Sequence, residues 1–254
     1  MTASPFDLSG RRILITGSNG GLGLAIARGL AAAGASPILN GRDEEKLRGA
    51  ADGLRAEGFG VEEARFDVAV EAEVVAAIDR LEADRPIDVL INNAGIQRRA
   101  RLDEIGLDVW DEVLRTNLTS AMLVSRQVSR GMIVRGRGKI VNIGSVMSDL
   151  ARTTTGAYAA AKGGLKMLTK AMCADWGPLG LQVNAIGPGY FATDMTRPLI
   201  ENPDFNAWVV GRTPARRWGR PEELVGAAAF LSSPASDFVN GQILYVDGGM
   251  TAVI

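Results

Sequence analysis

Short apolar runs alternate with longer amphipathic segments along the whole chain of 254 residues. The runs are apolar at nearly every position, as in parallel strands covered by helices on both faces. The segments between them repeat apolar positions at helical spacing. The predicted strands are 12–16, 37–40, 61–66, 89–92, 139–143, 182–186 and 243–246, and the predicted helices are 21–33, 44–57, 71–83, 108–134, 158–176 and 221–231.

This alternation predicts a parallel sheet built through right-handed crossovers. No repeat, low-complexity tract or linker divides the chain, so we expect one doubly wound α/β domain over residues 1–254, with a seven-stranded parallel sheet and helices on both faces. The least regular stretch, about 187–220, is too long for a structureless loop. We expect it to contain a short helix around 205–210 and to cover the substrate.

Composition excludes several classes of protein. A net charge of −1 gives no reason to expect nucleic acid or an anionic membrane as a partner. The single cysteine, Cys173, cannot form an intrachain disulfide and agrees with a reducing compartment. Without histidine, a zinc site lacks its usual ligands, and no metal is predicted. The apolar stretch 22–39 contains charged, glycine and proline residues, and residues 1–12 show no signal pattern, so a cytoplasmic protein without membrane spans is expected.

A glycine-rich turn follows the first predicted strand and leads into a helix. Its spacing is Gly-x-x-x-Gly-x-Gly, from Gly17 to Gly23. Glycines at such a turn let backbone amides approach a pyrophosphate and let the helix pack closely on the sheet. The alternative is a tight turn without a ligand, but its place after the first strand favours a dinucleotide. The predicted cofactor contacts here are Gly17, Ser18, Asn19, Gly21, Leu22 and Gly23.

The end of the second strand indicates which dinucleotide binds. NAD-binding proteins usually carry an acid here, whereas a basic residue accommodates the 2′-phosphate of NADP. This strand ends in Asn40-Gly41-Arg42, which favours NADP(H) through Arg42 and leaves NAD(H) possible. Asp43 is expected to cap the next helix. Asp67, followed by Val68, either accepts from the adenine amino group or caps the helix that begins at Glu71.

Tyr158 and Lys162 stand four residues apart in a predicted helix, with Ser145 upstream of it. Residues at this spacing share a helix face. A nearby ammonium lowers the pKa of a phenol, which can then exchange a proton with an alcohol or a carbonyl. Taken alone, the pair fits a packing tyrosine beside a solvated lysine better than a catalytic pair, and the other motifs decide between them. A Ser-His-Asp nucleophile is excluded because the chain has no histidine.

Together these motifs resemble the short-chain dehydrogenase/reductase family over essentially the whole chain. The matching pieces are Thr16-Gly17-x-x-x-Gly21-x-Gly23, Asn92-Asn93-Ala94-Gly95, Asn117, Ser145, Tyr158-x-x-x-Lys162 and Pro188-Gly189. The resemblance implies a Rossmann-like fold, a nicotinamide cofactor and, commonly, a homotetramer.

The resemblance also assigns roles to individual residues. Tyr158 is the acid/base, Ser145 orients the substrate oxygen, and Lys162 holds the nicotinamide ribose and lowers the pKa of the tyrosine. Asn117 continues the proton path through water. The remaining implied cofactor contacts are Asn93, Ala94, Gly95, Pro188, Gly189, Phe191 and Thr193.

Three arginines, Arg98, Arg99 and Arg101, follow the Asn-Asn-Ala-Gly turn. One of them, Arg99, is our candidate to bind a substrate carboxylate bidentately beside Ser145 and Tyr158; the alternative is a solvated basic loop or a subunit contact. Segments 92–99, 171–176, 187–191 and 212–219 resemble the gluconate 5-dehydrogenase branch of the family. That branch interconverts D-gluconate and 5-dehydro-D-gluconate, usually with NADP(H). Gly20 stands where relatives that prefer NADP often carry a second basic residue, which leaves room for dual cofactor use.

Other functions share these motifs. A 3-oxoacyl-[acyl-carrier-protein] reductase has the same catalytic set but needs a basic docking surface and a more apolar pocket. Another polyol or sugar dehydrogenase of the family also fits. A cofactor-sensing binding protein is the non-enzyme alternative, since a fold does not determine a function; the intact Ser145, Tyr158 and Lys162 argue against it.

Overall fold

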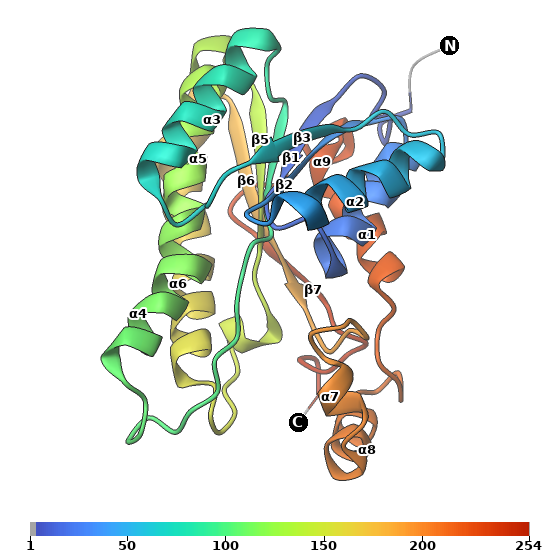
Figure 1. Ribbon diagram of the computed structural model, residues 1–254, viewed down its shortest axis with the longest axis vertical. Helices are drawn as coiled ribbons and strands as arrows, with labels where there is room; N and C mark the ends of the chain where they lie inside the picture. The colour runs from blue at the N-terminus through green and yellow to red at the C-terminus, as the bar shows by residue number, and fades with distance from the viewer. Residues whose placement is uncertain (1–3, 254) are drawn as a thin grey trace.

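The computed structural model describes residues 4–253. Seven parallel strands form one sheet in the order β3-β2-β1-β4-β5-β6-β7 (Figure 1). This confirms the predicted doubly wound α/β fold. The strands are β1 (Arg12–Ile15), β2 (Ser36–Gly41), β3 (Glu62–Arg65), β4 (Val89–Asn92), β5 (Gly138–Ile143), β6 (Leu181–Pro188) and β7 (Ile243–Val246).

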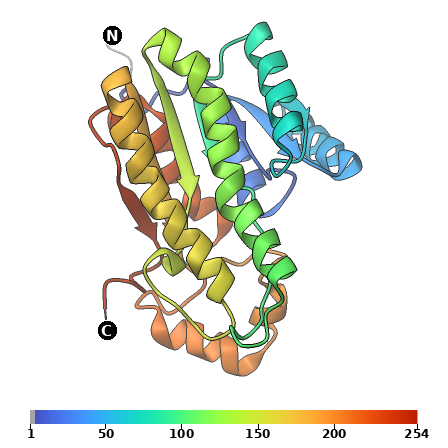
Figure 2. The ribbon, with the colours of Figure 1, turned by 90° about the vertical axis from the view of Figure 1, so that its left-hand side faces the viewer.

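Helices cover both faces of the sheet because successive strand residues point to opposite sides. In β1, Ile13 and Ile15 belong to one buried cluster and Leu14 to the other. Helices α1 (Gly21–Ala32), α2 (Glu44–Ala56) and α9 (Val225–Ser232) pack on the first cluster. Helices α3 (Glu71–Asp84), α5 (Ser120–Arg135) and α6 (Gly156–Trp176) cover the second, as Figures 1 and 2 show.

The predicted helix 108–134 is interrupted by a π-helical turn. Helix α4 (Leu107–Leu114) ends in a π-helical turn, Arg115–Thr119, from which α5 continues. The side chain of Asn117 donates to the Val113 carbonyl at 3.0 Å and to the Ile96 carbonyl at 2.9 Å, so it competes with the regular helical bonds. Similarly, the predicted helix 221–231 begins as a 3₁₀ turn, Pro221–Leu224.

The irregular stretch 187–220 contains two helices, α7 (Arg197–Ile200) and α8 (Pro203–Arg212). The predicted helix around 205–210 is therefore confirmed and is longer than expected. Asn202 begins α8 by accepting a hydrogen bond from the Phe205 amide at 2.9 Å. Both helices lie beyond the carboxyl ends of the strands, at the bottom of Figure 1.

The sequence offers two aspartates, Asp43 and Asp67, as helix caps. Asp43 caps α2, because its side chain accepts from the Lys46 amide at 3.1 Å. Asp67 does not cap α3: the N-cap residue of that helix is Val70. The Asp67 carboxylate instead accepts from the Ala69 amide at 2.8 Å, in the turn before the helix.

Within residues 4–253, no helix combines the length and the hydropathy that crossing a membrane requires. Over the same residues, no three histidine, cysteine, aspartate or glutamate side chains gather as they do around a metal ion.

The turn between β1 and α1 provides a test of packing. A Cβ at position 23 would lie 2.5 Å from Asn93 Nδ2 and 2.6 Å from the Gly17 carbonyl oxygen. We expect Gly23→Ala to destabilise the protein by about 1–3 kcal/mol. The matched control is Gly49→Ala on the exposed face of α2, where a Cβ meets nothing within 4 Å. That change should leave stability equal or raise it by up to about 1 kcal/mol. Thermal unfolding of both variants checks this, and equal midpoints would contradict it.

Candidate active site

The predicted site residues come together at the carboxyl edge of the sheet. β1 pairs with β2 on one side and with β4 on the other. The chain order therefore reverses between β1 and β4, and ligands of open α/β sheets bind at such a point. The turns after β1, β4, β5 and β6 carry most of the predicted residues.

The glycine-rich turn after β1 packs closely against the turn after β4 at Gly17. Gly17 has φ +61°, and a Cβ there would lie 2.8 Å from Ala94 Cα. Gly21 has φ +54° with open space beside it. Asn93 Nδ2 donates to the carbonyls of Thr16 and Gly17, both at 2.9 Å. The resulting backbone cradle fits the pyrophosphate of a dinucleotide.

Ser18 has a structural position inside this turn. Its side chain is fully buried, and its hydroxyl donates to the Ile15 carbonyl at 2.7 Å and accepts from the Asn40 amide at 3.0 Å. Its own amide donates to the Asn40 carbonyl. Ser18 therefore shapes the turn, and the polar groups we predicted to contact the cofactor are already bonded within the protein. Asn19 is placed differently, with its side chain against Gly41 at the end of β2.

Arg42 is solvent-exposed at the end of β2, with 72% of its side-chain surface accessible. Its only carboxylate neighbour in the described chain is Asp67, at 3.4 Å. Asn40, on the same strand, has no free amide hydrogen, because Nδ2 donates to the carbonyls of Ala64 and Phe66. Arg42 is therefore the cation that can meet a 2′-phosphate, and Asp67 lies next to it.

The other predicted cofactor contacts differ in exposure. Val68 and Phe191 are buried in the apolar core, so little of either side chain is accessible to a ligand. Thr193 lies partly exposed and exchanges hydrogen bonds with Thr196. Leu22 lies in the first turn of α1 and Pro188 ends β6. Gly95 and Gly189 lie in the segments that follow β4 and β6.

The structure brings Ser145, Tyr158 and Lys162 together. Ser145 caps the 3₁₀ turn Val146–Ser148: its hydroxyl accepts from the Met147 amide at 3.1 Å, and its own amide donates to Ser148 Oγ. Lys162 is buried, and its ammonium donates to the Ile143 carbonyl at 2.6 Å. It lies 5.7 Å from the centroid of the Tyr158 ring.

The pKa of Tyr158 departs from the sequence expectation. Desolvation raises the pKa of this phenol, although its hydrogen bond with Ser145 acts in the opposite direction. Burial also lowers the pKa of Lys162 to about 8. The net shift of the tyrosine pKa is therefore opposite to the expected lowering, because burial is the largest cause.

Asn117 is buried and its amide is fully used. Both amide hydrogens are donated, to Ile96 and Val113, and its Oδ1 accepts from the Ile96 amide at 3.0 Å. The side chain thus fastens the loop after β4 to the π-helical turn. A role of Asn117 in a water-mediated proton path remains a prediction.

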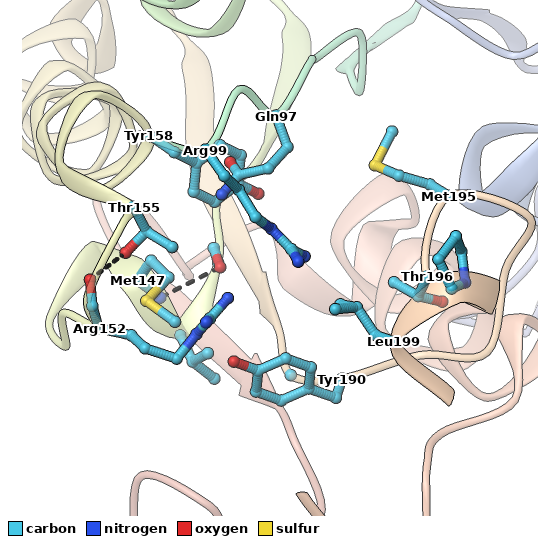
Figure 3. Close-up of a pocket in the computed structure, with 14 residues that line it drawn as sticks. Gln97, Arg99, Met147, Arg152, Thr155, Tyr158, Tyr190, Met195, Thr196 and Leu199 are labelled. Carbon is cyan, nitrogen blue, oxygen red and sulfur yellow. Dashed lines mark hydrogen bonds between the residues drawn. The ribbon is translucent and has the colours of Figure 1, made fainter. Parts of the chain in front are cut away.

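A pocket of about 360 Å³ opens between Ser145, Tyr158 and α7 (Figure 3). Of the three candidate arginines, only Arg99 lines it. Arg98 pairs with Glu112 at 2.9 Å and Arg101 with Asp103 at 2.9 Å, both on the surface. The full lining is Gln97, Arg99, Ser145, Val146, Met147, Arg152, Thr155, Tyr158, Gly189, Tyr190, Met195, Thr196, Pro198 and Leu199.

Sequence reasoning missed Arg152 and Gln97 and treated Tyr190 only as part of a covering segment. Arg152 lies between Ser145 and Tyr158 in the chain, and this interval was the available signal. Figure 3 shows its guanidinium pointing into the same space as that of Arg99. Tyr190, Met195, Thr196, Pro198 and Leu199 form one wall of the pocket. That the segment 187–220 covers the substrate stays a prediction.

Comparison with known proteins agrees with this geometry. Residues 17–251 match the family model described as enoyl-(acyl carrier protein) reductase. The gluconate 5-dehydrogenase of Gluconobacter oxydans (strain 621H) is 54% identical over 247 residues, which are 97% of this chain and 96% of the relative. The 2-dehydro-3-deoxy-D-gluconate 5-dehydrogenase of Formosa agariphila is 49% identical over 257 residues, which are 100% of this chain and 97% of the relative.

A solved structure shows the same similarity in three dimensions. The crystal structure of a gluconate 5-dehydrogenase from Burkholderia cenocepacia J2315 in complex with NADP and tartrate is 55% identical, with a TM-score of 0.96. The match covers 98% of each chain. The glycine turn, the Ser-Tyr-Lys set and these matches lead to one conclusion: the chain belongs to the short-chain dehydrogenase/reductase family of oxidoreductases.

Proposed function

We propose that this protein is an NADP(H)-dependent oxidoreductase that interconverts D-gluconate and 5-dehydro-D-gluconate. One observation carries the proposal: Arg99 shares a pocket with Ser145 and Tyr158. A cation beside a proton-transfer pair suits a substrate that has both a carboxylate and a secondary alcohol. The two curated relatives above are named for oxidation at C5 of a six-carbon sugar acid, which supports the same carbon here.

In the proposed reaction, NADP(H) supplies or accepts the hydride when bound. Tyr158 gives a proton to the C5 oxygen during reduction and takes it back during oxidation. Ser145 holds that oxygen through its hydroxyl. Lys162, fixed by the Ile143 carbonyl, favours the phenolate electrostatically in its ammonium form. The glycine turn and Arg42 hold the two phosphate-bearing parts of NADP(H), with Arg99 directed at the substrate carboxylate.

The pocket supports this proposal over the alternatives. A 3-oxoacyl chain needs an apolar channel, whereas two arginines, Arg99 and Arg152, face this pocket. A neutral polyol gives these cations no partner. The cofactor-sensing alternative predicts no turnover of any substrate. A spectrophotometric screen of gluconate, 5-dehydrogluconate, neutral polyols and an acetoacetyl thioester with each cofactor therefore separates all four functions.

We also propose a homotetramer in the cytoplasm. Phe238 is fully exposed, and Leu244 and Val253 are 41% and 48% exposed, so the C-terminal region offers an apolar surface for a subunit contact. The single cysteine supports a reducing compartment.

Tyr158 provides the first test. Removing its hydroxyl removes the proton donor, so Tyr158→Phe should lower kcat by about a hundredfold or more while NADPH binding is retained. Tyr245→Phe is the control, because that hydroxyl bonds Asp149 outside the pocket. Steady-state kinetics and fluorescence titration with NADPH measure both effects. Retention of a tenth of the wild-type kcat in Tyr158→Phe would refute the acid/base assignment.

Arg42 tests the cofactor assignment. Loss of a charge-assisted bond to the 2′-phosphate should raise the KM for NADPH about ten- to a hundredfold in Arg42→Ala, with little change for NADH. Arg48→Ala is the matched control, since Arg48 is an exposed arginine of α2 that pairs with Glu44. Equal changes for the two cofactors would show that Arg42 does not read the phosphate.

The raised pKa of Tyr158 predicts different pH profiles for the two directions. The phenol is protonated at neutral pH, which is the form that reduction needs. Oxidation needs the phenolate, so its kcat/KM should rise by up to about tenfold per pH unit above pH 7. The rise should flatten once Lys162, with its pKa of about 8, loses its charge. Initial rates in both directions check this, and an oxidation rate independent of pH would contradict it.

A further inference from the structure

Two arginines face one pocket without a carboxylate partner from the protein. Arg99 comes from the loop after β4 and Arg152 from the loop before α6, and Figure 3 shows both guanidinium groups directed into the space beside Tyr190. Neither forms an ion pair within residues 4–253, whereas their neighbours Arg98 and Arg101 do. Desolvation, followed by the charge of Arg152, lowers the pKa of Arg99. Two like charges held this close are stabilised by an anion between them.

Three polar atoms at this pocket also lack partners. Arg152 Nε, the Tyr190 hydroxyl and Gln97 Oε1 are each buried without a hydrogen bond to any described residue. All three residues line the pocket. A buried unsatisfied polar group costs about 1–3 kcal/mol. Together they form a set of donors and acceptors that suits a ligand carrying a carboxylate and several hydroxyls.

The position of Arg152 is fixed by its surroundings. Its guanidinium carbon lies 4.9 Å from the centroid of the Phe205 ring of α8, in a cation–π contact. Its backbone carbonyl accepts from the Thr155 hydroxyl at 2.7 Å. Phe205 in turn packs edge-on against Tyr190, with centroids 5.8 Å apart. A stacked guanidinium keeps its N–H edge free to bind an anion in the ring plane.

We propose that Arg152 is a substrate-binding residue that shares the sugar-acid carboxylate with Arg99. The Tyr190 hydroxyl and Gln97 then bind hydroxyls of the carbon chain between the carboxylate and C5. This assignment rests on the proposed function and adds to it: the pair of arginines makes the pocket select an acid over the corresponding alcohol.

Two substrates isolate the carboxylate. D-glucitol differs from D-gluconate only at C1, where a hydroxymethyl group replaces the carboxylate. The variants are Arg152→Met, which keeps an apolar side chain over Phe205, and Arg152→Lys, which keeps a charge without the planar fork. Arg101→Met is the control, because Arg101 pairs with Asp103 outside the pocket.

In Arg152→Met we expect kcat/KM for D-gluconate to fall about ten- to a hundredfold, mainly through KM. The value for D-glucitol should stay within about threefold of wild type. Arg152→Lys should recover part of the loss in kcat/KM for D-gluconate. Arg101→Met should leave kcat/KM unchanged for both substrates. If Arg152 only packed on Phe205, its loss would lower kcat/KM for both substrates by the same factor. That result would overturn the proposal, as would an unchanged kcat/KM for D-gluconate.

A binding measurement separates this inference from the proposed function. Calorimetric titration of D-gluconate and D-glucitol into Tyr158→Phe loaded with NADP⁺ requires no turnover. If the wild type does not oxidise D-gluconate but the acid binds through Arg152, the proposed function fails and the carboxylate site stands. The quantity to compare is the ratio of the Kd for D-gluconate to the Kd for D-glucitol. If this ratio is the same in Tyr158→Phe and in the double variant that also carries Arg152→Met, the carboxylate site fails, whatever the enzyme oxidises.

Discussion

The hydrogen bonds between the turn after β1 and the turn after β4 hold the site together. The Thr16 hydroxyl accepts from the amides of Asn93 and Ala94 at 3.0 and 3.1 Å. The Asn93 side chain returns two bonds to the carbonyls of Thr16 and Gly17. These contacts join the two strands at which the sheet order reverses. The cofactor turn, and through it the distance to the catalytic residues, depends on this junction.

The catalytic set depends on a second junction, at the end of β5. Ile143 ends that strand and accepts from Lys162, while Ser145 begins the turn that follows. One strand therefore places both the cation and the hydroxyl relative to Tyr158. Tyr158 and Lys162 are both shielded from solvent, and the lack of solvent shifts their pKa values in opposite directions. It raises the pKa of the phenol and lowers that of the ammonium.

The sequence predicts the strands well because strands buried on both faces leave continuous apolar runs. Strands β4 and β7 begin and end where predicted. The break at Asn117 could not be predicted, since it requires Ile96 from a distant loop. For the same reason the sequence does not reveal that the side chains of Ser18 and Asn117 bond to the protein's own backbone. Arg152 was missed because its direction is set by Phe205, which no local pattern connects to it.

The π-helical turn at Arg115–Thr119 is equivalent to one residue inserted into a continuous helix. An insertion of one residue rotates the following side chains by about 100° around the axis. Before the turn, Val113 packs in a small cluster with Ala157 and Ala161 of α6. After it, Val124 and Val128 pack on the sheet. A single helical rod thereby supports the sheet with one half and the helix that carries Tyr158 and Lys162 with the other, without a loop between them.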